Sequence, residues 1–120
     1  MWRVVSGYDL PSGERSYPVA VIVANLAKPT QQTPALMGHD DVVTLFHEMG
    51  HLFHELLSKT QFSRFHGTTG ALDFVEAPSQ MLENWCYEPE VSGRMSSHYE
   101  TKQPLSKELI DKLIKRWVTK

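Results

Sequence analysis

The stretch that decides the fold covers residues 40–58 and reads DDVVTLFHEMGHLFHELLS. Its apolar side chains recur every three or four residues, at Val42, Leu45, Phe46, Met49, Leu52, Phe53 and Leu56. This spacing predicts a helix over residues 40–58 with one apolar face. Asp40 and Asp41 are expected to cap its first turn and to complement the positive end of its dipole.

The same stretch contains the pattern His-Glu-x-x-His at His47, Glu48 and His51. Residues four apart on a helix lie on one face about one turn apart, so two imidazoles can reach a single metal ion. Glu48 then projects beside the ion and can act as a general base. The pattern therefore predicts a hydrolytic zinc site; the alternative is a pair of histidines without a metal.

A zinc site of this type takes three protein ligands, so the third must come from elsewhere. His54 lies one turn beyond His51, but three histidines in line along one helix cannot surround an ion. Glu76, near the start of a second predicted helix, is a better candidate, because a glutamate facing two histidines gives a known hydrolytic ligand set. Spacing alone does not choose Glu76 over Asp73 or Glu83.

Gln80 and Glu83 are expected on the same side of the second helix as Glu76. Either side chain could orient a ligand histidine by a hydrogen bond. The ordinary polarity of a helix surface would explain the same residues equally well. His54 is expected as a neighbour of the site or as a partly exposed residue.

The segment before residue 40 predicts a small β-hairpin followed by a loop. Residues 11–14 read as a turn, because proline presets φ and glycine tolerates positive φ. Residues 17–26 form a valine-rich run, which is typical of a strand covered on nearly both faces. Residues 27–37, with two prolines and several polar residues, predict a loop.

Residues 61–72 hold two glycines and predict a segment without regular structure. A second helix should begin near Val75, with Pro78 in its first turn and Pro89 marking its end. A turn is expected around residues 92–93.

Ser106 should cap a last helix, whose apolar stripe we expect to pack in the core. The stripe consists of Leu109, Ile110, Leu113, Ile114 and Trp117.

Length and composition predict one folded unit, because 120 residues suit a single domain. The net charge of −2 and the lack of a basic block argue against a nucleic-acid partner. The longest apolar run, residues 19–24, is too short to cross a membrane, and no long apolar leader is present. Cys86 is the single cysteine, so no internal disulfide can form, which favours a reducing intracellular compartment.

Several segments together resemble the family of thimet oligopeptidase, neurolysin and saccharolysin. They are the motif at residues 47–51, DFVEAPSQMLENW at residues 73–85, VANLAKPT at residues 23–30 and HDDV at residues 39–42. The resemblance continues through residues 105–115 and so covers most of the chain.

The resemblance implies that His47, His51 and Glu76 bind one Zn²⁺ per chain and that Glu48 is the catalytic base. It implies a mainly α fold with a small N-terminal β-hairpin: a gluzincin-type core with an active-site helix and a second helix that bears the glutamate. It also implies an endopeptidase that cleaves short peptides and is cytoplasmic or sometimes mitochondrial. No membrane partner is expected, and the oligomeric state is left open.

The family's members run to several hundred residues, including a helical domain that walls a channel and a later segment with tyrosines and a histidine. We therefore expect residues 1–120 to be one catalytic-core segment, incomplete relative to the family, with weak or no turnover alone. The alternative is a truncated, inactive zinc-binding fragment that serves as a peptide-binding or structural module. A helical scaffold without metal is a third interpretation.

Overall fold

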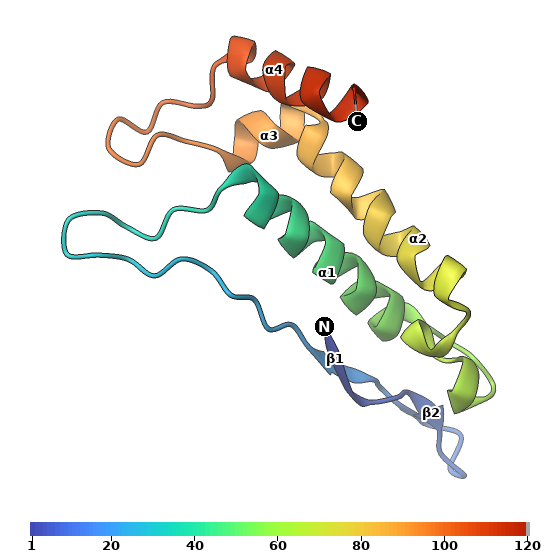
Figure 1. Cartoon of the computed structure of the whole chain (residues 1–120). Coiled ribbons are helices and arrows are strands. Elements are labelled where there is room, and N and C mark those ends of the chain that lie inside the picture. Colours follow the sequence, from blue (N-terminus) through green and yellow to red (C-terminus); the bar gives the residue numbers. More distant parts are fainter. Residues whose placement is uncertain (120) are drawn as a thin grey trace.

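Helix α1 (His39–Leu57) runs through the middle of the computed structural model, which describes residues 1–119 (Figure 1). The predicted helix is confirmed to within one residue at each end. The expected cap is wrong, because Gly38 occupies the capping position. The backbone N–H of Gly38 donates to the Asp41 carboxylate over 2.9 Å, so Asp41 reaches back from the first turn to satisfy a free donor.

The N-terminal segment forms the predicted antiparallel hairpin, in two short ladders. Strand β1 (Trp2–Val5) pairs with β4 (Val19–Val21), and β2 (Tyr8–Asp9) pairs with β3 (Arg15–Ser16) nearer the turn. The turn contains Gly13 at φ 85°, a conformation that favours glycine.

The strand predicted over residues 17–26 is wrong in length and in burial. Only residues 19–21 pair, and Val19 and Val21 are 49% and 44% exposed. Pro18 has no N–H to give to the ladder, and β4 has a partner strand on one side alone. Residues 22–38 have no regular structure, which confirms the expected loop.

The second helix, α2 (Leu72–Glu83), begins three residues before Val75. Pro78 therefore lies inside the helix and not in its first turn, which corrects the prediction. A proline there removes one backbone hydrogen bond. The 3₁₀ turn η3 (Asn84–Tyr87) continues the helix.

Pro89 ends that run, as predicted, but also begins α3 (Pro89–Met95) as its first residue, a position for which its φ is suited. Ser92 and Gly93 lie in this helix, so the turn expected there is wrong. The Ser92 hydroxyl donates to the carbonyl of Cys86 over 2.7 Å and ties α3 to η3.

The segment expected to lack regular structure between α1 and α2 holds two single 3₁₀ turns, η1 (Ser63–Phe65) and η2 (Gly67–Thr69). The last helix, α4 (Lys107–Val118), has the predicted Ser106 cap, whose Oγ accepts from the N–H of Leu109 over 3.4 Å. Ile110 on its apolar stripe is buried, but Leu109 and Trp117 stay largely exposed, so the expected core packing holds only in part.

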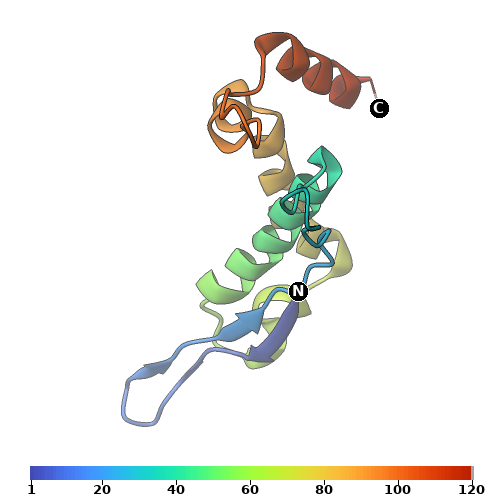
Figure 2. The same ribbon diagram turned by 90° about the vertical axis from the view of Figure 1, so that its left-hand side faces the viewer.

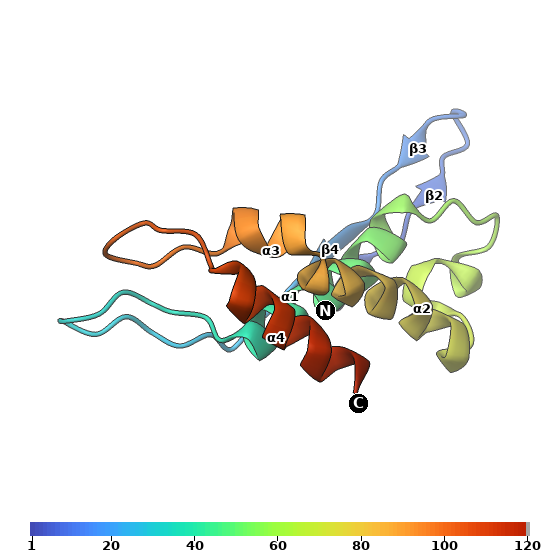
Figure 3. The ribbon, with the colours of Figure 1, turned by 90° about the horizontal axis from the view of Figure 1, so that it is seen from above.

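The exposed apolar residues reflect an open arrangement of these elements. The hairpin lies at one end of the molecule and α4 at the other (Figures 1 and 2), and the loops before α1 and α4 project on the same side (Figure 3). The radius of gyration is 18.1 Å, against about 14 Å for a compact domain of this length. The main contact is between α1 and α2. Within residues 1–119, no helix combines the length and the apolar character needed to span a membrane.

Candidate metal centre

Helix α1 packs tightly against α2 at Gly50, which is buried against residues 78–79. A Cβ at Gly50 would collide with the Cα of Ser79 and lie only 2.7 Å from the carbonyl oxygen of Pro78. Glycine therefore permits the contact that brings the middle of α2 against the His47–His51 turn of α1. The sequence-predicted motif and Glu76 meet for this reason.

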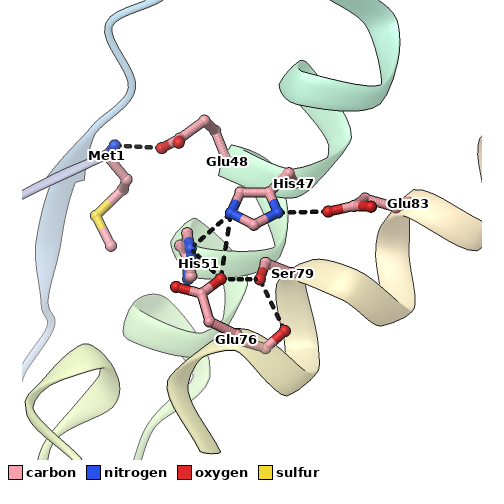
Figure 4. A network of polar contacts seen from close by, with 7 residues as sticks. All are labelled: Met1, His47, Glu48, His51, Glu76, Ser79 and Glu83. Carbon is pink, nitrogen blue, oxygen red and sulfur yellow. Dashed lines mark hydrogen bonds and ion pairs between the residues drawn. The ribbon is translucent and has the colours of Figure 1, made fainter. Parts of the chain in front are cut away.

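Three side chains converge where the helices meet: His47 and His51 from α1 and Glu76 from α2 (Figure 4). The Oε2 atom of Glu76 lies 3.3 Å from the Nε2 of His47 and 3.4 Å from that of His51. The two Nε2 atoms are 3.1 Å apart. Ligands bound tetrahedrally to zinc at about 2.0–2.1 Å are separated by about 3.3 Å. The three spacings thus match one face of a zinc tetrahedron.

Glu83 fixes the orientation of the His47 ring. Its Oε1 lies 2.5 Å from the Nδ1 of His47. A carboxylate only accepts hydrogen bonds, so the proton sits on Nδ1 and the lone pair of Nε2 faces the other two donors. Of the two candidates for this contact, Glu83 makes it, whereas Gln80 is exposed.

Ser79 holds Glu76, a contact that the sequence analysis missed. The fully buried hydroxyl of Ser79 lies 2.9 Å from Glu76 Oε2 and 2.8 Å from the Glu76 carbonyl oxygen. The spacing of three residues on one helix was the available signal.

Asp73 and His54, the other candidate ligands, do not belong to this group of three donors. Asp73 accepts from the backbone N–H of Phe74 over 3.0 Å, at the start of α2. The ring of His54 packs edge-on against Phe74, 5.7 Å between centroids.

Glu48 faces a neighbouring open pocket of about 270 Å³, lined by Met1, Glu48, His51, Thr68, Val75 and Glu76. Its carboxylate accepts a hydrogen bond from the amino group of Met1 (Figure 4). This hydrogen bond, helped by the positive charge of the amino group, lowers the pKa of Glu48 below its ordinary value, although partial burial opposes the shift.

A second imidazole–carboxylate pair was missed by the sequence analysis. Glu55, at the end of α1, and His66, just before η2, are both fully buried, with Nδ1 of the ring 3.0 Å from Oε1 of the carboxylate. Glu55 follows His51 by four residues, which was a signal for a shared helix face. Nothing in the sequence marked His66 as its partner.

The sequence model of peptidase family M3 matches residues 2–119. The chain belongs to this family. It is similar to a thimet-like oligopeptidase of Dictyostelium discoideum, with 43% identity over 116 residues, covering 95% of this chain and 17% of that protein.

Two further M3 relatives show the same coverage. Oligopeptidase A of Escherichia coli (strain K12) is 47% identical over 103 residues, which are 85% of this chain and 15% of that protein. Saccharolysin of Saccharomyces cerevisiae is 43% identical over 111 residues, which are 92% of this chain and 16% of that protein. The chain thus spans about a sixth of the length of the curated relatives it matches.

Proposed function

We propose that residues 1–120 form the catalytic-core segment of a gluzincin-type M3 metalloendopeptidase that hydrolyses peptide bonds in short peptides. The observation that carries the proposal is the convergence of His47, His51 and Glu76, at zinc-like spacing, next to a pocket that contains Glu48. Membership of family M3 and the names of the oligopeptidase relatives support the substrate class.

One Zn²⁺ per chain would be held by Nε2 of His47, Nε2 of His51 and Oε2 of Glu76. Bound there, zinc would supply Lewis-acid chemistry, which makes water a better nucleophile and polarises a carbonyl group. Glu83 holds the proton of His47 on Nδ1 and so keeps Nε2 available as a ligand. Ser79 restrains the carboxylate of Glu76 that faces both rings.

Glu48 is the proposed general base. Its carboxylate would take a proton from the attacking water and pass it to the nitrogen of the leaving amine, so that the same oxygen serves both transfers.

A second function is favoured by the coverage of about a sixth of the relatives' length. The chain would then be a zinc-binding fragment that binds peptides, or serves a structural role, with weak or no turnover. Intact Glu48 favours the catalytic proposal, since a purely structural zinc site needs no base. Cytoplasmic or mitochondrial location remains a prediction from the resemblance alone.

Metal analysis combined with Glu48→Gln tests the proposal. The purified chain should retain one zinc per molecule, and peptide cleavage, followed by chromatography, should stop on chelation. Glu48→Gln should keep the zinc and lose the cleavage. Glu90→Gln, at an exposed glutamate on α3, is the matched control and should change neither property. Zinc bound without cleavage would favour the second function, and absence of zinc would refute both.

A further inference from the structure

Glu55 and His66 are the largest of the fully buried side chains among the described residues, although both are polar. Burying a carboxylate is costly unless its oxygens are hydrogen-bonded. Three hydrogen bonds reach Glu55: the Nδ1 of His66 at 3.0 Å, the backbone N–H of Thr68 at 3.1 Å and the hydroxyl of Thr68 at 3.3 Å. The pair therefore fixes both the backbone and the side chain of Thr68.

The close fit around this pair leaves Thr68 little freedom. Gly67 lies at φ 50°, and a Cβ there would overlap the Glu55 carboxylate. The N–H of Gly67 donates to the hydroxyl of Ser58 over 3.0 Å. On the far side, a Cβ on Gly7 of the hairpin would lie 3.2 Å from Nε2 of His66. His66 is thus held between α1 and the hairpin, and Thr68 is tied to α1 through Glu55.

Thr68 lines the same pocket as Glu48, His51 and Glu76. Its hydroxyl has one proton, which goes to Glu55, so the oxygen is left with its lone pairs. In this state Thr68 can accept a hydrogen bond but cannot donate one. At Thr68 the pocket therefore offers an acceptor, which suits a group that donates a hydrogen bond.

We propose that Thr68 binds the peptide substrate by accepting a hydrogen bond from one of its backbone N–H groups, and that Glu55 and His66 are the positioning residues that set the Thr68 proton. This rests on the proposed peptidase function. It adds a substrate-binding residue outside both the zinc motif and the Glu76 segment.

The test measures peptide binding by the zinc-loaded chain in a Glu48→Gln background, so that no cleavage interferes. The probe is a fluorescein-labelled hexapeptide of alternating alanine and leucine, read by fluorescence anisotropy. Thr68→Val removes the hydroxyl at constant shape and should weaken binding about three- to tenfold. Thr68→Ser keeps the hydroxyl and should bind within about twofold of the parent. Thr60→Val, at a threonine outside the pocket, should change nothing.

A set of hexapeptides, each N-methylated at one amide, locates the donor. The peptide methylated at the amide that Thr68 contacts should bind the parent and Thr68→Val equally, because it has no N–H to donate there. This non-additivity identifies the amide that pairs with Thr68. Glu55→Gln should weaken binding of the unmodified peptide, since the carboxamide can donate to the Thr68 oxygen and occupy it. Adding Glu55→Gln to Thr68→Val should then cause no further loss.

The inference is overturned if Thr68→Val binds the peptide as tightly as the parent while its zinc content and circular dichroism spectrum are unchanged. That result would leave the peptidase proposal standing. The same holds if every methylated peptide responds alike to Thr68→Val. If the zinc-loaded parent binds no hexapeptide at all, both proposals fail.

Discussion

Two imidazole–carboxylate pairs, each with one member on α1, use the same atoms in different surroundings. In the first, Glu83 meets Nδ1 of His47 at 2.5 Å and both side chains are 28% exposed; in the second, Glu55 meets Nδ1 of His66 at 3.0 Å with both side chains fully buried. The free Nε2 of His47 faces two further donor atoms, whereas that of His66 is buried without a hydrogen-bond partner. The first pair presents the Nε2 atom that we propose as a zinc ligand, and the second holds the loop at Thr68. Burial, rather than the pairing itself, separates the two roles.

Removing the carboxylate of the buried pair should have the largest effect on stability. Glu55→Ala leaves Nδ1 of His66 and both Thr68 donors without their acceptor, and each buried donor left unpaired costs about 1–3 kcal/mol. Urea unfolding followed by circular dichroism measures the loss. Glu90→Ala, at an exposed glutamate, should stay within about 0.5 kcal/mol of the parent. Equal stability of Glu55→Ala and Glu90→Ala would contradict the structural role given to the buried pair.

Gly50→Ala should disturb the region of His47 and Glu83 and spare the buried pair of Glu55 and His66. The added Cβ meets the backbone of Ser79, so α2 must move away from α1 and carry Glu76 with it. Overpacking of this kind costs about 1–3 kcal/mol, and zinc affinity should fall by at least about tenfold. Gly93→Ala is the control, because its Cβ meets nothing within 4 Å, and it should stabilise α3 by up to about 1 kcal/mol. Unchanged zinc affinity in Gly50→Ala would show that the helix contact does not set the site.

Glu83→Gln tests the partly exposed pair of His47 and Glu83. The amide no longer requires the proton on Nδ1 of His47, so zinc affinity, measured by competition with a chelating dye, should fall about 10- to 100-fold. The metal-free chain should lose less than about 1 kcal/mol, because exposed ion pairs contribute little. Gln80→Ala on the same helix should bind zinc as the parent does. If Glu83→Gln lost much stability but kept its zinc affinity, Glu83 would serve the fold and not the metal site.

Cys86, which belongs to neither pair, gives the smallest effect. Burial, with a contribution from Glu83, raises the pKa of its thiol to about 11. The folded state therefore binds this proton more tightly than the unfolded state, and its contribution to stability is complete below about pH 9 and lost as pH rises toward 11. At pH 8, iodoacetamide should label the native chain much more slowly than the urea-unfolded chain. Equal labelling rates would contradict the buried thiol.

The sequence predicted the helices that carry the metal motif, because apolar periodicity and caps are local signals. It predicted the hairpin turn but not the short, exposed β4, because burial depends on which elements cover a strand. It placed Pro78 in a first turn, since helix α2 starts earlier than its apolar pattern suggested. The sequence left Gln80 and Glu83 as equal candidates to orient a histidine, and it did not predict the Glu55–His66 pair. Both contacts depend on where segments distant in sequence meet.

We propose that α1 and α2 bring His47, His51 and Glu76 around one zinc ion. X-ray absorption at the zinc edge of the zinc-loaded chain tests this ligand set. We expect two imidazole rings and oxygen ligands at about 2.0–2.2 Å, with one imidazole lost in His51→Ala and weaker zinc retention in Glu76→Ala. A spectrum with no histidine scattering, or one that neither substitution alters, would contradict it.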